Sequence, residues 1–460
     1  MGIPNSIFRA LKAIPIPLYL LLVTSALAQG PADVPRLLNS NGYSDSANDV
    51  NPQLSTDKAG TWLAVWHSFE DLNGTVGSDS DIFFARSLDS GKTWSSPHAL
   101  NSNAGTDTGS DELPRVTTDL EGNWVAVWYS RENLQGLASS DLDILFSRSG
   151  DNGKTWSAPA LLNSNGNTDS GDDGWPVVQT DRTGKWIAMW WSADGVLGQA
   201  NIDSDIFVST STDNGKTWSP RKSLVSGGDG DFGFASEPRF TTDYNGNWVA
   251  VWRCNYDRDD RDIAVVTSKD NGLSWTEPAL LNSNGHSDSG DDAYPCVTTD
   301  GAGNWVVVWR SSEDLNGTAG TDRDIFVSTS TDNGANWTPP SLLNTNGNSD
   351  TGKDQIPQII TDQRGHWMTV WSSNENLNGE AGNDGDIFMA TSTDNGISWT
   401  PPSLLNVNGA DDTVDDFVPQ IATDEKGTWL AIWDSENDTD KNTGKDFDIF
   451  VTVMKNSTHP

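Results

Sequence analysis

Pairs of aspartates separated by one residue recur along the chain, each just before a β-rich segment such as DIFFARS. Further acidic residues follow the recurring phrase LNSNG, as in Asp169 with Asp173 and Asp288 with Asp292. Carboxylate and asparagine oxygens in glycine-containing loops are the ligands that calcium prefers. The same residues also form solvated turns through hydrogen bonds to their own backbone, and no segment has the full EF-hand spacing. Calcium ligands and solvated turns therefore stay open as alternatives. The candidate metal ligands are Asp79, Asp81, Asp141, Asp143, Asp203, Asp205, Asp322, Asp324, Asp384 and Asp386.

Cationic and aromatic residues gather in one part of this acidic chain. Most of them stand in two segments of the fourth unit, SGGDGDFGFASEPRF and RCNYDRDDRD, and the others lie elsewhere in the chain. Aromatic planes beside arginines suit a sugar ring with an anionic group, through stacking, cation–π contacts and charge-assisted hydrogen bonds. The alternative is that the phenylalanines fill a shortened loop and the arginines neutralise neighbouring aspartates. The candidate ligand-binding residues are Arg115, Trp175, Trp191, Phe232, Phe234, Arg239, Arg253, Tyr256 and Arg310.

These residues are carried by a repeated unit. The phrase Thr-Asp-x-x-Gly-x-Trp-x-x-x-Trp occurs seven times along the chain. A fixed period of this size indicates stacked or circular supersecondary units. The aspartates of the phrase are Asp57, Asp119, Asp181, Asp243, Asp300, Asp362 and Asp424.

Each unit reads as four β-strands. PQLSTD alternates apolar and polar residues, TWLAVW and DIFFARS are β-rich, and TWSSPHALN follows a tight turn. Four antiparallel strands make one propeller blade. The last unit lacks its fourth strand, and VPRLLNSNG near residue 34 matches that strand in the other units. We therefore predict an all-β, seven-bladed propeller whose last blade is completed by the N-terminal strand, which removes free sheet edges.

The turn between the third and fourth strands carries a recognisable motif. In the first unit it contains Ser87, Asp89, Gly91, Thr93 and Trp94. This motif resembles the Asp box, or BNR repeat, of the sialidase-like propellers. The resemblance implies that the Asp boxes lie on the face opposite the ligand site, and that the other loops form the ligand face. The motif returns at Asp151, Asp213, Asp270, Asp332 and Asp394.

Departures from the repeat gather in the third to fifth units. Trp252 lies closer to Asp262 than Trp66 does to Asp81, so the fourth unit has lost a loop segment. Trp175 stands outside the repeated tryptophan positions, as does Trp191. We therefore predict that the protein recognises a glycan on the loop face of blades three to five. Cys254 and Cys296 are predicted to form a disulfide that braces this region.

Catalysis is an alternative to simple binding. Family sialidases are six-bladed and use three arginines, a Tyr–Glu nucleophile pair and an aspartic acid/base. By that resemblance, Arg115 and Arg239 follow the proline of their first strands, and Arg253 or Arg310 supplies the third arginine. The candidate catalytic residues are Glu237, Tyr256 and Tyr294. An exo-acting sialidase-like glycoside hydrolase and a calcium-dependent adhesion or protein-interaction scaffold are the two alternatives to a glycan-recognising protein.

The termini and the charge define the compartment and the partners. Residues 1–28 combine Arg9 and Lys12, an apolar run and small residues at Ala26 and Ala28, as secretory signal peptides do. We expect a secreted or periplasmic protein with a propeller at residues 29–455 and a tail at 456–460. A net charge of −37 opposes binding to nucleic acid or anionic membranes. We expect a monomer that binds a glycan or glycoconjugate, without membrane insertion or an organic cofactor.

Overall fold

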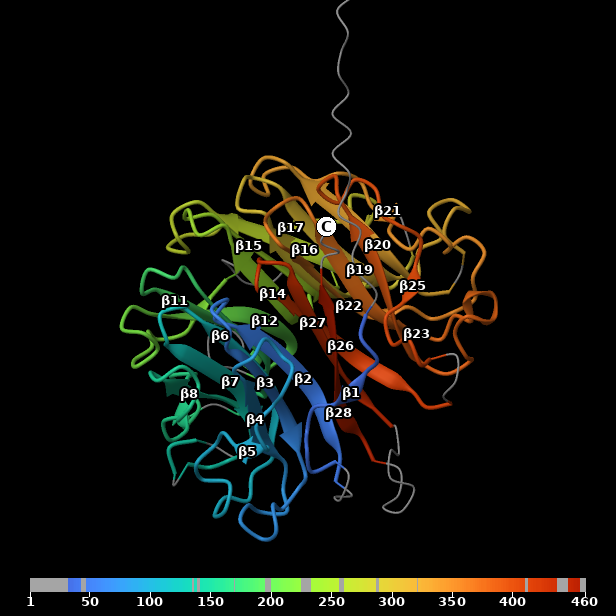
Figure 1. The fold of residues 1–460 in the computed structure, drawn as a ribbon. Coiled ribbons are helices and arrows are strands. Elements are labelled where there is room, and N and C mark those ends of the chain that lie inside the picture. Colours follow the sequence, from blue (N-terminus) through green and yellow to red (C-terminus); the bar gives the residue numbers. More distant parts are fainter. Residues whose placement is uncertain are drawn as a thin grey trace, which may run out of the picture.

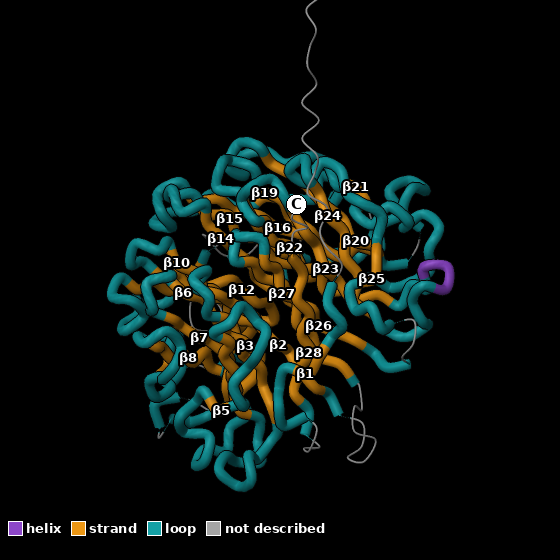
Figure 2. The backbone as a smooth tube through the Cα atoms, viewed as in Figure 1, coloured by secondary structure: helices purple, strands orange, loops and turns teal. Residues whose placement is uncertain are grey.

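Seven four-stranded antiparallel sheets make up the protein, as the sequence repeat predicts (Figure 1). The computed structural model describes residues 32–42, 47–134, 136–138, 141–168, 170–194, 200–224, 233–255, 260–286, 289–320, 322–409, 413–436 and 446–455, with only the backbone at 200–203 and 378. Strands occupy the middle of the molecule and loops surround them (Figure 2). No helix among these residues has the length and apolar character needed to cross a membrane.

The strands follow one another along the chain within each blade. Blade 1 contains β2 (Asp49–Thr56), β3 (Trp62–Ser68), β4 (Asp81–Ser87) and β5 (His98–Ala99). Blade 2 contains β6 (Asp111–Thr118), β7 (Trp124–Ser130), β8 (Asp143–Ser149) and β9 (Ala160–Leu161). Blade 3 contains β10 (Asp173–Thr180), β11 (Trp186–Asp194), β12 (Ala200–Ser211) and β13 (Lys222–Ser223). Blade 4 contains β14 (Ser236–Thr242), β15 (Trp248–Cys254), β16 (Asp262–Ser268) and β17 (Ala279–Leu280).

The remaining blades repeat the pattern. Blade 5 contains β18 (Ala293–Thr299), β19 (Trp305–Ser311), β20 (Asp324–Ser330) and β21 (Ser341–Leu342). Blade 6 contains β22 (Gln355–Thr361), β23 (Trp367–Ser373), β24 (Asp386–Ser392) and β25 (Ser403–Leu404), with the short 3₁₀ helix η1 (Leu377–Gly379) between its second and third strands. Blade 7 contains β26 (Asp416–Thr423), β27 (Thr428–Ser435), β28 (Asp448–Lys455) and, from the other end of the chain, β1 (Arg36–Leu37).

The N-terminal strand closes the ring. Arg36 pairs with Val451 and Leu37 with Phe450, so that β1 lies beside β28 (Figure 1). The first strands of the seven blades contact one another in sequence order, and β26 of blade 7 contacts β2 of blade 1. These first strands, here called the inner strands, therefore surround a central channel.

Hydrophobic side chains hold neighbouring blades together. The core of the described residues divides into seven clusters, and each cluster joins two adjacent blades. The two tryptophans of each second strand supply much of it: Trp62 and Trp66, for example, are fully buried. Burial of such large rings is the main stabilising contribution expected between sheets.

The Asp boxes cap the turns between the third and fourth strands. Asp89 accepts hydrogen bonds from the Thr93 backbone N–H (2.9 Å) and hydroxyl (2.7 Å), and these bonds lower the pKa of Asp89 to about 2. Gly91 has a φ of +78°, and a Cβ atom there would lie 2.2 Å from a methyl group of Leu430 in blade 7. Glycine is therefore required both by the turn and by the close approach of the next blade.

A buried asparagine explains the recurring LNSNG phrase. The side-chain amide of Asn101 donates to Asp81 (2.6 Å) and to Asp111 (2.8 Å), and its carbonyl accepts the N–H of Ile82 (3.1 Å). This asparagine therefore ties the third strand of blade 1 to the inner strand of blade 2. Amides at the same place donate to the third-strand aspartate of their own blades at Asn39, Asn163, Asn282, Asn344 and Asn406.

Candidate functional site

A ring of β-bulges surrounds one mouth of the channel. In every inner strand the pairing register shifts just before the proline position, and the bulged residue has a φ between 47° and 57° although it is not glycine. Such a φ is sterically costly, most of all for β-branched residues, and strain of this kind concentrates at functional sites. The bulged residues are Asn51, Leu113, Trp175, Glu237, Tyr294, Ile356 and Val418.

The mouth of the channel holds a pocket of 290 Å³. Because the bulges lie at the N-terminal ends of the inner strands, this mouth opens on the face opposite the Asp boxes, here called the loop face. Six of the seven bulged residues and several side chains from the next layer form the wall. The lining residues are Asn51, Leu113, Arg115, Tyr129, Trp175, Arg239, Tyr294, Ile356, Gln358, Val418 and Gln420.

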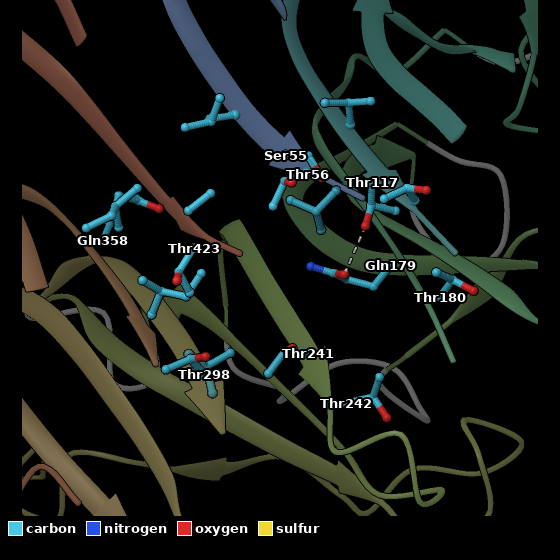
Figure 3. Close-up of a pocket in the computed structure, with 18 of the residues that line it drawn as sticks. Ser55, Thr56, Thr117, Gln179, Thr180, Thr241, Thr242, Thr298, Gln358 and Thr423 are labelled. Atoms are coloured by element: carbon cyan, nitrogen blue, oxygen red, sulfur yellow. Dashed lines mark hydrogen bonds between the residues drawn. The ribbon is translucent and has the colours of Figure 1, made fainter. Parts of the chain in front are cut away.

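Deeper in the channel the lining changes to hydroxyl and amide groups. Figure 3 shows this part, where Ser55, Thr241 and Thr298 come from three different inner strands. Thr117 donates to the side-chain carbonyl of Gln179 at 3.5 Å. Toward the Asp-box face, Lys58 forms an ion pair with Glu425. The charges of Lys58 and Glu425 therefore offset each other at that end.

Two arginines share the wall of the pocket. One guanidinium nitrogen of Arg115 donates to the carbonyl of Pro114 (3.1 Å), and one of Arg239 donates to the carbonyl of Pro238 (2.9 Å). Neither guanidinium forms an ion pair with any residue that the structure describes. Burial lowers the pKa of Arg115, and the charge of Arg239 lowers it further. Because a guanidinium stays protonated in proteins, the pocket holds two positive charges that an anion would stabilise.

Aromatic rings cover one side of this pocket. The rings of Trp175 and Tyr294 lie 5.9 Å apart with an angle of 41° between their planes. The guanidinium of Arg310 lies 5.0 Å from the centre of the Tyr294 ring. Together these side chains form a platform that links blades 3 and 5 across the mouth of the channel.

Glu237 contacts the backbone of Tyr294, one of the platform residues. Its carboxylate forms an ion pair with Arg253 (2.8 Å) and accepts the backbone N–H of Tyr294 (2.7 Å), and the side chain is almost fully buried. A carboxylate engaged in this way positions Tyr294. Among the described residues, the Tyr294 hydroxyl makes no hydrogen bond, so Glu237 and the phenol do not form the predicted nucleophile pair through a direct contact.

Trp191 and Phe234 form an outer rim beside this platform. Their rings lie 6.4 Å apart, and the guanidinium of Arg253 lies 5.9 Å from the Phe234 ring. Trp191 covers Gly174, where a Cβ atom would lie 2.9 Å from the indole. The structure thus gathers seven of the nine predicted ligand-binding residues around the mouth. Phe232 and Tyr256 lie outside the described residues.

One pocket residue, Tyr129, belongs to a side-chain pair that the sequence analysis did not predict. The Tyr129 hydroxyl donates to Glu112 at 2.7 Å, across a directly paired position of β6 and β7. Burial raises the pKa of Tyr129, and the bond to Glu112 raises it further. The sequence does indicate Tyr129 as a site residue, because it directly follows the second tryptophan of its strand, as Arg253 and Arg310 do in theirs.

The predicted disulfide is wrong. Both cysteines are buried, and no disulfide joins them. Cys254 packs in the cluster between blades 3 and 4, and its thiol donates to the carbonyl of Asp262 at 3.5 Å. Cys296 follows the proline of β18 and lines the channel, where its sulfur lies 3.7 Å from the side-chain carbonyl of Gln358. The two side chains therefore belong to different environments despite their nearby strands.

Acidic residues gather at two places on the loop face, away from the pocket. One oxygen from each of Asp79, Asp81 and Asp107 lies within 4.8 Å of the others in blade 1. Asp322, Asp324 and Asp350 form the equivalent group in blade 5. The sequence predicted the Asp-x-Asp pairs but not Asp107 or Asp350. The described residues contain no third group of this kind. The side chain of Asp203 lies outside the described residues. The other predicted metal ligands do not belong to either acidic group: Asp141, Asp143, Asp205, Asp384 and Asp386.

Asp434 supplies a test of the electrostatics near the mouth. It is buried, accepts the backbone N–H of Asn51 at 2.9 Å, and burial raises its pKa from 3.8 to about 7. The stability that the protonated Asp434 contributes to the folded state is therefore fully present below pH 4 and is lost as the pH rises through 7.

We expect Asp434→Asn to gain stability relative to the wild type between pH 4 and pH 8, on the order of 2–4 kcal/mol. Chemical denaturation across this range measures the gain; Asp33→Asn, at an exposed site, is the control. A difference that stays constant with pH would contradict the assignment.

Fold and site together define an Asp-box β-propeller with a charged, aromatic pocket at one channel mouth. The chain belongs to the BNR repeat-like domain family, whose sequence model matches residues 122–358. No curated protein sequence matches the chain significantly.

Solved structures share the fold at low sequence identity. A protein of unknown function from Dyadobacter fermentans is 12% identical with a TM-score of 0.51, and the match covers 92% of this chain and 98% of that one. The Hadza microbial sialidase Hz136 is 18% identical with a TM-score of 0.45 (83% and 75% covered). An α-L-arabinanase from Penicillium chrysogenum is 17% identical with a TM-score of 0.44 (74% and 92% covered). The first of these likenesses concerns the fold alone.

Proposed function

We propose that this protein recognises a glycan that carries a carboxylate, and that the glycan binds in the pocket at the loop-face mouth of the channel. The observation that carries the proposal is the pair Arg115 and Arg239, two half-buried guanidiniums that share one pocket wall without a described ion-pair partner. Guanidiniums bind carboxylates through paired, charge-assisted hydrogen bonds.

The aromatic platform suits the rest of such a ligand. Trp175 and Tyr294 offer ring faces on which a sugar can stack, and Arg310 behind Tyr294 adds positive potential. The amides of Gln358 and Gln420 supply hydrogen-bond donors and acceptors for sugar hydroxyls. Wall, platform and amides converge on a volume of 290 Å³, which falls at the small end of ligand pockets.

Binding to an array of acidic and neutral glycans tests this proposal. We expect acidic glycans to bind and neutral ones to bind weakly or not at all. Arg115→Ala and Arg239→Ala should each lower the affinity by roughly 10- to 100-fold, because a charge-assisted contact is lost. Arg131→Ala, at an exposed arginine next to β7, removes the same charge and should change nothing. Equal losses in all three variants would point to bulk charge instead and would refute the pocket.

Hydrolysis is the second candidate, and one observation favours it. The Tyr129–Glu112 hydrogen bond of 2.7 Å places a tyrosine–carboxylate pair beside Arg115. The sialidases that this chain resembles use a pair of this kind as nucleophile. A fluorogenic sialoside separates the candidates: turnover that Tyr129→Phe abolishes supports an exo-acting hydrolase, and binding without turnover leaves a recognition protein.

Calcium and export complete the proposed function. We propose calcium as a stabiliser of the loop face, not as a ligand of the glycan, because the acidic groups lie apart from the pocket residues. We also propose a secreted or periplasmic protein, on the strength of residues 1–28. If the arginine variants bind the glycan as the wild type does while calcium removal abolishes binding, the protein functions instead as a calcium-dependent adhesion scaffold.

A further inference from the structure

Buried oxygens without partners mark both acidic groups. In blade 1, Asp81 is fully buried, and its Oδ2 has no hydrogen-bond partner. Oδ2 of Asp79 and Oδ1 of Asp107 are likewise buried and unpartnered, and so is the side-chain carbonyl of Asn103. Buried polar atoms are almost always satisfied in folded proteins. Four such atoms at one place indicate a missing ligand.

Protein donors hold the other oxygen of two of these carboxylates, Asp81 and Asp107. Asn101 donates to Oδ1 of Asp81 at 2.6 Å, and the Asn103 amide nitrogen donates to Oδ2 of Asp107. The carboxylates of Asp81 and Asp107 are thus each fixed by one oxygen, and the other oxygen is left without a protein donor. Asn103 presents its carbonyl in the same way, because its nitrogen is already used.

Blade 5 repeats this arrangement with different residues. Asn346 donates to Oδ2 of Asp350 at 2.6 Å, and Asn344 donates to Oδ1 of Asp324 at 2.7 Å. Oδ2 of Asp322, Oδ1 of Asp350 and the carbonyl of Asn346 are buried without partners. The same geometry at two distant blades argues against a chance cluster.

The electrostatics agree with a missing cation. The described residues provide no lysine or arginine in ion-pair contact with either group. Three carboxylates and an amide carbonyl form an all-oxygen donor set, which calcium accepts in flexible geometry.

We infer that each group binds one calcium ion, which ties the loop between the second and third strands to the linker that enters the next blade. The first ion is held by Asp79, Asp81, Asn103 and Asp107, and the second by Asp322, Asp324, Asn346 and Asp350. This inference deepens the calcium part of the proposed function and does not depend on glycan binding. The same spacing, Asn-x-x-x-Asp, occurs in the linkers that follow four other blades. Its asparagines there are Asn41, Asn165, Asn284 and Asn408.

Calcium titration of chelator-treated full-length mature protein tests the inference. We expect calcium at about 1 mM or below to bind and to raise the melting temperature. Asp107→Asn and Asp350→Asn should each lower the number of bound ions by one, and the double variant by two. Asp71→Asn, at an exposed aspartate in the same loop of blade 1, should bind as the wild type does. Equal stoichiometry in all variants, or no binding by the wild type, would overturn the inference.

The sign of the stability change separates a metal site from a structural hydrogen-bond network. In chelator, Asp107→Asn should melt at or above the wild type, because one of three repelling carboxylates is neutralised. In calcium, the order should reverse. A variant that melts below the wild type to the same extent in both conditions would contradict metal binding. Loss of glycan binding in Arg239→Ala with normal calcium stoichiometry would keep this result distinct from the glycan proposal.

Discussion

A chain that begins at Asn39 should fail to form a stable monomer. It lacks β1, so β28 loses its pairing at Arg36 and Leu37 and the bond from the Leu38 N–H to the carbonyl of Ile449 (2.7 Å). Leu38 is 2% exposed and belongs to the core cluster between blades 7 and 1. Its loss leaves a cavity and an open sheet edge, which is a template for aggregation.

Graded variants separate the two effects. Leu38→Ala should cost about 2–5 kcal/mol in the free energy of unfolding, as other buried leucine truncations do. Val34→Ala, at a side chain that is 72% exposed, should cost little. A synthetic peptide of residues 29–40 should restore a monomeric, cooperative melt to the shortened chain, because strand addition can occur in trans. A shortened chain that is monomeric and melts like the full one would show that β1 does not close the ring.

Removal of Glu237 should destabilise the fold and disorganise the pocket together. Glu237→Ala leaves Arg253, whose side chain is 18% exposed, without its counter-charge, and it leaves the Tyr294 N–H without its acceptor. Breaking a buried ion pair from one side typically costs about 3–5 kcal/mol. Glu277→Ala, at an exposed glutamate in the same blade, is the matched control.

A double-mutant cycle sharpens this prediction. Replacement of both partners, Glu237→Gln with Arg253→Gln, should recover part of the loss, because a neutral pair leaves no unpaired buried charge. Denaturant unfolding gives the stabilities, and the glycan array gives the effect on the pocket. The structural assignment would be contradicted by a single variant as stable as Glu277→Ala, or by a double variant that recovers nothing.

The fold could be predicted from the sequence because its information is periodic. The repeated Trp-x-x-x-Trp phrase marks each second strand, and the displaced LLNSNG segment shows where the ring closes. Both features can be recognised from local residue patterns and from the number of strands in each unit. Neither requires knowledge of which side chains meet across a sheet.

The pocket could be predicted only in part. Trp175, Arg239 and Tyr294 stood out because they depart from the repeat. The bulge ring and the Tyr129–Glu112 pair did not, since a bulge is defined by the register between two strands and not by residue spacing along one. The predicted disulfide failed for a related reason: strand neighbourhood does not tell which face a side chain occupies, and Cys296 faces the channel while Cys254 faces blade 3.

The acidic loops show the same limit. Asp173 was grouped with the calcium candidates, yet one of its carboxylate oxygens accepts the buried amide of Asn163 at 2.7 Å. The residues that do join the Asp-x-Asp pairs, Asp107 and Asp350, lie four positions after a loop asparagine. Contacts, not spacing, therefore decide the role of each aspartate: Asp173 joins two blades, whereas Asp81 both accepts the Asn101 amide and faces Asp79 and Asp107.

The most direct test of the central claim is a calorimetric titration with the acidic glycan that binds best on the array and with the methyl ester of its carboxylate. If Arg115 and Arg239 bind the carboxylate, the acid should bind at least about tenfold more tightly than the ester. In the Arg115→Ala/Arg239→Ala double variant, acid and ester should bind equally weakly. Equal affinity of acid and ester for the wild type would contradict the account.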